Sequence, residues 1–427
     1  MKNDHQRRIR ASTGQQGLTV VVADVRQRRL VWPQMSIGSH FLAAIVLVSC
    51  GASVPSDPQA QVEHTSASTY EFGQLIIWPT VDTTDVFNAE AIACLRRFCL
   101  NKVHPEINND YWYTPDLERF GGIHQELLYA EFDSVGDARY PPTLLAIRGT
   151  GIPDQRVLSV RWALMDSAGV ALRVRYVFDF LARRTADGVR LGFPLDHNTE
   201  HWGHKKVGQV SYIVSPEHTF SAVHAQQQMA DIERLSRFFE LPSFPITYYS
   251  CTDPTELFRI RGYQQHPLMH LYPTGGRAEG KDIVFSGNNK DVYTHEIVHL
   301  FTGRKFAERS WVLDEGLATV LAGSSEHSFT WHRSNLKRFL EAGSEVDLVA
   351  LFNTYDPMYI NEHTNVAYAV GGVLCERILR RKGKAALFKA LSSGTDPWPV
   401  LAEYEITRET LRSELVKELA LDPLIIP

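Results

Sequence analysis

The chain has 427 residues, of which 44% are hydrophobic and 22% are charged. This composition is ordinary for a soluble globular protein, and the part beyond the N-terminal segments, about 360 residues, is long enough for two domains with their own cores. The formal net charge of −5 argues against nucleic acid as a partner, because nucleic acids select basic surfaces.

The N-terminus has the features of an export signal. Arg26, Arg28 and Arg29 precede an apolar run over residues 41–48, which leads into Ser-Cys-Gly. A positive segment, a short apolar segment and small residues before a cleavage point describe a secretory signal, and the run is shorter than the roughly 20 residues of a membrane span. The ending resembles the lipobox of bacterial lipoproteins, which implies that Cys50 becomes the lipidated first residue.

Residues 1–50 are therefore interpreted as leader and lipoprotein signal, with Met1 or Met35 as the start. Residues 51–68 are small, polar and contain prolines, as expected of a flexible tether. The lipobox resemblance implies an exported protein that is lipid-anchored to a bacterial membrane and faces the periplasm or the exterior. In a cell with two membranes the outer one is favoured, since Gly51 is not the Asp that often retains lipoproteins at the inner membrane.

Four further cysteines lie in the rest of the chain: Cys94, Cys99, Cys251 and Cys375. Their spacing fits neither a zinc knuckle nor a disulfide scaffold. We expect buried thiols, with one long-range disulfide as the alternative.

Residues 69–208 are predicted to form an α+β domain. A helix over residues 86–103 precedes a series of strands with turns between them, at 144–148, 156–165, 170–182 and 189–194. The partial alternation of apolar and polar residues within 170–180 is typical of a sheet with one covered face. A helix on an antiparallel meander resembles the NTF2-like fold.

From residue 209 the pattern alternates between strands and helices. Strands are expected at 210–214, 246–250 and 282–286, and helices at 221–240 and 254–259. A run without Pro or Gly then follows over 291–301, with Asp291 as its expected N-cap.

This run contains the sequence His295-Glu-Ile-Val-His299. Residues four apart lie on one face of a helix, so His295 and His299 can offer two imidazole nitrogens to one metal ion. Glu296 can reach a water molecule on that ion without being a ligand, which is the HExxH arrangement of zinc hydrolases.

A catalytic zinc ion needs a third protein ligand and one open position. Glu315 lies sixteen residues beyond His299, within the apolar run 311–321. A turn at residues 302–304 is expected to separate two packed helices, of which the second presents Glu315 to the first.

With Glu-Gly-Leu-Ala at residues 315–318, the chain resembles the gluzincin metallopeptidases, and most closely the peptidase MA-like proteins. The resemblance implies that residues 209–427 form a metallopeptidase domain with a mainly helical C-terminal part. It also implies one Zn2+ ion held by His295, His299 and Glu315, with Glu296 as general base. Thr319 stands where thermolysin-like enzymes carry an Asp, while Asp291 and Asp314 are other carboxylates nearby.

The same resemblance implies two further parts of the site. The strand before the zinc helix would be the sheet edge that pairs with an extended substrate, formed by Ile283, Val284, Phe285 and Ser286; the alternative is a core strand. Tyr368 would donate a hydrogen bond to the oxyanion, with Tyr359, His363 and His327 as rivals.

The sequence therefore predicts a zinc-dependent metallopeptidase that acts on a peptide or protein substrate. Whether it is an endopeptidase or an aminopeptidase stays open. Two alternatives remain: a non-catalytic surface lipoprotein that binds a ligand or partner through its N-terminal domain, and a zinc amidase that acts on a non-protein amide such as cell-wall material.

Overall fold

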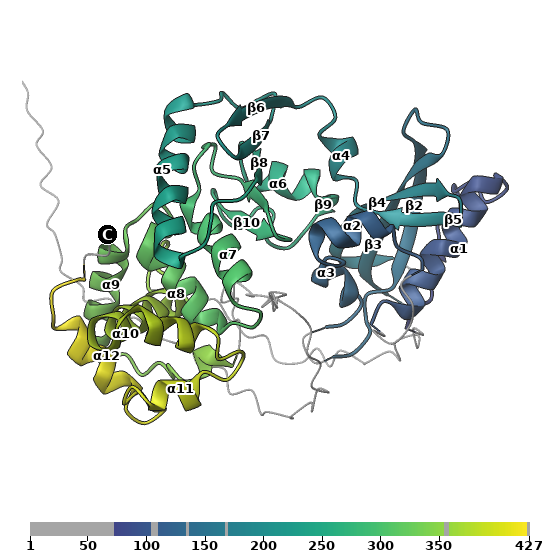
Figure 1. Ribbon diagram of the computed structural model, residues 1–427. Coiled ribbons are helices and arrows are strands. Elements are labelled where there is room, and N and C mark those ends of the chain that lie inside the picture. The colour runs from purple at the N-terminus through teal and green to yellow at the C-terminus, as the bar shows by residue number, and fades with distance from the viewer. Residues whose placement is uncertain (1–71, 104–109, 134–135, 167–169, 354–357, 425–427) are drawn as a thin grey trace, which may run out of the picture. The chain divides into compact units, whose positions relative to one another are not determined.

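The computed structural model describes residues 72–103, 110–133, 136–166, 170–353 and 358–424. All of them belong to one compact unit of the chain. The predicted leader and tether, and Cys50 with them, lie outside the described residues. Within those residues the fold is mixed, with twelve α-helices and two sheets (Figure 1). The predicted α+β class is compatible with this architecture.

The first sheet has the strand order β1-β2-β3-β4-β5, and β2 to β5 form an antiparallel meander. The bounds are β1 Ile76–Ile77, β2 Pro142–Gly149, β3 Gln155–Met165, β4 Ala171–Thr185 and β5 Gly188–Gly192. Helix α1 (Val86–Asn101) packs against β5 through an apolar face that includes Leu95 and Phe98. The predicted helix and antiparallel strands are confirmed; the NTF2-like resemblance remains a prediction.

Short elements surround this first sheet and connect it to the second. Helices α2 (Thr114–Phe120), α3 (Gln125–Leu128) and α4 (Leu195–Asn198) are three of them. The fourth is strand β9 (Tyr263–Gln265), which comes much later in the chain but pairs antiparallel with β4.

The second sheet has the strand order β10-β11-β8-β7-β6. Its strands are β6 Gly203–Val207, β7 Val210–Val214, β8 Ile246–Ser250, β10 Gly276–Glu279 and β11 Ile283–Ser286. The three central strands are parallel, and β6 and β10 are antiparallel edges.

The prediction that Ile283, Val284, Phe285 and Ser286 form the sheet edge is wrong. They make up β11, which pairs with β8 on one side and with β10 on the other, and all four are buried. A short run that is apolar apart from Ser286 fits an interior strand covered on both faces. The edge is β10 instead.

The two faces of the second sheet pack into different cores. Tyr248 and Val284 face a core formed with the C-terminal helices. Tyr249, Ile283 and Phe285 face a core shared with the first sheet and α1. The parts of the chain before and after the predicted boundary at 208/209 therefore share one core, with β6 and β9 each placed in the sheet of the other part.

The remaining helices follow the predicted, mainly helical pattern. They are α5 Ala222–Phe239, α6 Pro254–Ile260, α7 Thr294–Lys305, α8 Trp311–Ala322, α9 Phe329–Glu341, α10 Val366–Leu391, α11 Trp398–Ala402 and α12 Leu411–Leu419, with a 3-10 turn at Ala350–Phe352. The expected turn at 302–304 is wrong, because α7 continues to Lys305.

Among the described residues, no helix combines the length and the apolar character needed to cross a membrane. The four cysteines of the described part are buried and free.

Candidate metal centre

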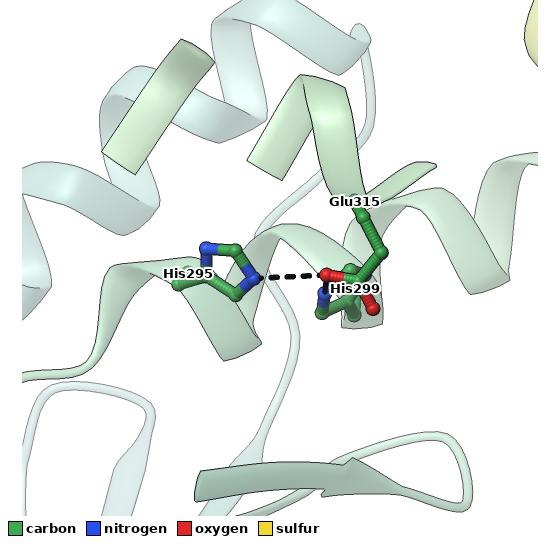
Figure 2. A group of neighbouring side chains, drawn as sticks. All are labelled: His295, His299 and Glu315. Carbon is green, nitrogen blue, oxygen red and sulfur yellow. Dashed lines mark hydrogen bonds and ion pairs between the residues drawn. The ribbon is translucent and has the colours of Figure 1, made fainter. Parts of the chain in front are cut away.

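Two neighbouring helices bring the three predicted ligands together. His295 and His299 lie one turn apart on α7, with ring centroids 5.1 Å apart, and Glu315 comes from α8. One possible ligand atom from each of the three lies within 4.8 Å of the others (Figure 2). Glu315 Oε2 is 3.2 Å from His295 Nε2 and 3.5 Å from His299 Nε2. All three residues are buried.

Helix α5 fixes where the first of these helices begins. The N–H of Tyr293 donates to Gln228 Oε1 at 2.7 Å, and the hydroxyl of Thr294 donates to Asp231 Oδ2 at 2.7 Å. The first bond satisfies a backbone N–H that has no partner inside the helix, and the second ties the first helical residue to α5.

Asp291 does not cap this helix, contrary to the expectation. Its carboxylate accepts hydrogen bonds from the Ser221 N–H and the Ser250 hydroxyl, and lies 3.0 Å from His218 Nε2. Asp291 therefore ties α5 to β8 and takes no part among the ligands.

Helices α8 and α10 approach closely because both carry glycine at their contact. A Cβ atom on Gly316 would collide with the backbone of Gly371 and Gly372, and one on Gly371 would collide with the Val312 carbonyl. The glycine of the Glu-Gly-Leu-Ala motif thus has a packing role. It lets α10 lie against the helix that carries Glu315.

Each ligand histidine has a partner on its other ring nitrogen. His295 Nδ1 lies 2.8 Å from the Gly323 carbonyl and can donate to it, which leaves Nε2, 3.2 Å from Glu315 Oε2, as the nitrogen that would face a metal ion. His299 Nδ1 lies 3.3 Å from Asp314 Oδ2. Such partners orient a metal-binding imidazole and raise its basicity.

Asp314 is itself held by a cation. Arg309 Nε is 3.4 Å from Asp314 Oδ2, and Arg309 Nη1 donates to the Thr302 hydroxyl of α7 at 2.9 Å. Thr319 does not replace the missing Asp of thermolysin-like enzymes, since its hydroxyl donates to the Glu315 carbonyl inside α8. Of the carboxylates considered from the sequence, Asp314 is the one that reaches a ligand.

The charges of the site are strongly coupled. Burial alone would raise the pKa of Glu315, but His299 and His295 outweigh it and hold that pKa well below its usual range. Burial would lower the pKa of His299, yet Glu315 and Asp314 raise it well above its ordinary value. The carboxylates therefore favour positive charge at this point, which is what a bound cation supplies.

Glu296 lies between the two histidines in sequence and contacts the edge of the second sheet. Its Oε2 accepts a hydrogen bond of 2.8 Å from the N–H of Ala278 on β10. The carbonyl of Gly275, just before β10, accepts a hydrogen bond from the N–H of Gly287, just after β11. Because the direction of the backbone groups alternates along an antiparallel strand, those of Gly276 and Ala278 point away from β11. The outward side of this edge strand therefore lies next to Glu296, the predicted general base.

Tyr368 lies beside the ligands. It stands in the first turn of α10, and its ring stacks near that of His295, with centroids 6.0 Å apart and planes at 18°. The rivals His327 and His363 contact each other, with centroids 4.9 Å apart, and His327 stacks on Trp331. Tyr359 contacts Tyr272. The oxyanion role of Tyr368 stays a prediction.

The sequence reasoning missed β10. Its residues, Gly-Arg-Ala-Glu, have neither β-branched nor aromatic side chains, and two of the four are charged. Such a segment has the pattern of a loop. Its one signal was its position just before the apolar run of β11.

The donors fit a zinc ion. Two imidazole nitrogens and one carboxylate oxygen are typical zinc ligands, and three protein ligands leave a position open. Across the described residues, this is the one group of three or more His, Cys, Asp or Glu close enough to share an ion.

No protein-family model matches the chain, and no curated protein matches it. The gluzincin resemblance therefore rests on the motif residues themselves.

Proposed function

We propose that the protein is a zinc-dependent metallopeptidase of the gluzincin type. The observation that carries the proposal is the convergence of three elements: the His295, His299 and Glu315 group, Glu296 beside it, and the outward edge of β10 bonded to Glu296. The proposal includes the export and the lipid attachment at Cys50 that the sequence predicts.

The bound zinc ion would supply Lewis acidity, lowering the pKa of water and polarising the scissile carbonyl. Glu296 would take the proton from the attacking water and deliver it to the departing amine. A carboxylate held by a backbone N–H is fixed in direction, as proton transfer requires. Tyr368, beside His295, would donate a hydrogen bond to the oxygen that becomes negative.

The substrate would bind as an added strand on β10. The outward backbone groups of Gly276 and the outward carbonyl of Ala278 would offer donors and acceptors to an extended peptide, while the Ala278 N–H holds Glu296. Binding of this kind depends little on the side chains of the substrate. This role replaces the one predicted for Ile283–Ser286, whose backbone is paired on both sides.

The test compares zinc content and cleavage of a mixed peptide library by the full chain and two variants. Glu296→Gln should keep one zinc ion per chain and lose cleavage, because the amide cannot accept a proton. Glu308→Gln, the same change at an exposed residue beyond α7, should cleave like the wild type. If Glu296→Gln still cleaves, Glu296 is not the general base. If the wild type binds zinc but cleaves no peptide, the proposed peptidase activity is wrong.

A further inference from the structure

Strand β10 has two faces with different contacts. Side chains alternate along a strand, so Arg277 and Glu279 share the face opposite to that of Gly276 and Ala278. A Cβ atom on Gly276 would collide with the Tyr293 ring, just before α7, which places the small residues toward the zinc helix. The charged residues turn toward α3 and the first sheet.

Those charged residues belong to an ionic cluster, here called the β10 clamp, which consists of the buried Glu126, Arg261 and Glu279 and the partly exposed Arg277. Arg277 Nη1 is 2.8 Å from Glu126 Oε1, and Arg277 Nε is 2.9 Å from Glu279 Oε1. Arg261 also pairs with Glu279. Glu126 lies on α3, in the N-terminal part of the chain, so the clamp joins that part to the edge strand.

The clamp is poorly suited to adding stability. The side chains of Glu126 and Arg261 are only 2% and 1% exposed, so burying their charges costs several kcal/mol each. Glu126 Oε2, Glu279 Oε2, Arg261 Nε and Arg261 Nη1 are buried without a hydrogen-bond partner. Replacing such a cluster by apolar residues is often neutral or stabilising, and fixing a geometry is a reason to keep one.

Electrostatics holds the clamp in its ionised form. Burial alone would raise the pKa of Glu126, but Arg277 and Arg261 outweigh it and hold that pKa well below its usual range. The ion pair between Glu126 and Arg277 is therefore intact at neutral pH.

The clamp and the catalytic base contact consecutive residues of one short strand. Arg277 is held by Glu126, and the N–H of the next residue, Ala278, is held by Glu296. A displacement of Arg277 therefore moves the N–H that fixes Glu296 and the edge on which the substrate would lie.

We propose that Glu126 is a positioning residue, which acts through Arg277 to hold β10 in register with Glu296. The N-terminal part of the chain thereby sets the geometry of the peptide-binding edge. This inference rests on the proposed function for its catalytic consequence, while its structural part is independent of it.

A matched control separates positioning from general stability. Glu131 is also a buried carboxylate of the N-terminal part, only five residues away, and it pairs with Lys102 and accepts a hydrogen bond from the Gly73 N–H. These partners belong to the first part of the chain. Glu126→Gln and Glu131→Gln thus remove the same charge from similar surroundings, but only the first acts on Arg277.

The first measurement is hydrogen exchange of the zinc-loaded full chain. Glu126→Gln should speed exchange about tenfold in a peptide covering residues 276–279, an effect of the size expected for the interaction energy of residues in contact. The exchange rates of α7 should not change. Glu131→Gln should leave the same peptide at its wild-type rate. Equal effects of the two variants on residues 276–279, or no effect of Glu126→Gln there, would overturn the positioning role.

The second measurement is kinetic and uses a fluorogenic peptide chosen from the library. Glu126→Gln should lower kcat/KM about tenfold per zinc-loaded molecule. Adding Arg277→Gln should lower kcat/KM little further, because both changes break the same Arg277–Glu126 ion pair. Arg277→Lys serves if Glu126→Gln does not fold, and should show the same two effects. Additive losses, or unchanged kcat/KM, would overturn the catalytic consequence. A wild type without cleavage would refute the proposed function but leave the exchange result as the test of the clamp.

Discussion

At the residue scale, the site can be divided into what spacing predicts and what only packing provides. His295 and His299 follow from a spacing of four on a helix, and Glu315 follows from the motif on the next helix. The partners of these ligands do not follow from spacing. The Gly323 carbonyl reaches His295 across a fold in the chain that no local pattern specifies.

Asp314 gives the first prediction at this scale. Asp314→Asn should lower zinc affinity about 10- to 100-fold, because the amide orients His299 but no longer raises its basicity. A competition titration with a chromogenic chelator measures the change. Asp116→Asn, at another buried ion-paired carboxylate, should bind zinc like the wild type. Unchanged affinity in Asp314→Asn would show that Asp314 does not support the ligand.

Tyr368 gives the second prediction at the residue scale. Tyr368→Phe should lower kcat about a hundredfold, the typical loss for one oxyanion donor, and leave zinc content unchanged. Steady-state kinetics with the fluorogenic peptide tests this. Tyr404→Phe, whose hydroxyl donates to the Ala386 carbonyl in the C-terminal helices, is the control. A kcat close to that of the wild type would exclude Tyr368 as the donor.

At the element scale, strongly periodic segments were predictable and edge segments were not. The predicted helix 221–240 corresponds to α5, and the strands at 210–214 and 246–250 to β7 and β8. The position of β11 within the sheet was wrong because a strand's place depends on its neighbours, and β10 had no recognisable pattern. Sequence patterns show which face of an element is apolar, but not which element covers it.

The close contact of α8 and α10 gives a prediction about elements. Gly316→Ala should destabilise the protein by about 1–3 kcal/mol or more, because the new methyl group meets the backbone of α10. It should also weaken zinc binding by displacing the helix of Glu315. Urea unfolding and zinc titration measure both. Gly149→Ala has open space around the added methyl group and should change neither; a stable, zinc-binding Gly316→Ala would contradict the packing.

At the scale of the whole molecule, the N-terminal part and the part that carries His295, His299 and Glu315 share a core. His124 and His266 lie in this shared region, and the ring of each contacts Tyr263. Burial lowers the pKa of His124 to about 4 and that of His266 to about 3, against the opposing pull of nearby carboxylates. Both are neutral in the folded protein at neutral pH.

The sign of the resulting pH dependence follows from proton binding. The unfolded chain binds protons on these histidines near pH 6.5, whereas the folded protein does not until pH 4 or below. Above about pH 6.5 these histidines are neutral in both states and cost no stability. As the pH falls below that value, each lowers the free energy of unfolding by about 1.4 kcal/mol per pH unit until it is protonated in the folded protein. His266→Gln should flatten the loss between pH 6.5 and 4 in urea unfolding, and His201→Gln, at an exposed site, should not. Equal slopes in both variants would contradict the buried neutral state.

The central claim is an open zinc centre made of His295, His299 and Glu315. The most direct test is X-ray absorption at the zinc edge of the zinc-loaded full chain, with Glu315→Ala beside it. We predict two imidazoles with oxygen neighbours at about 2.0–2.2 Å in the wild type, and loss of bound zinc in Glu315→Ala. Sulfur neighbours at about 2.3 Å, or full zinc retention with an unchanged spectrum in Glu315→Ala, would contradict it.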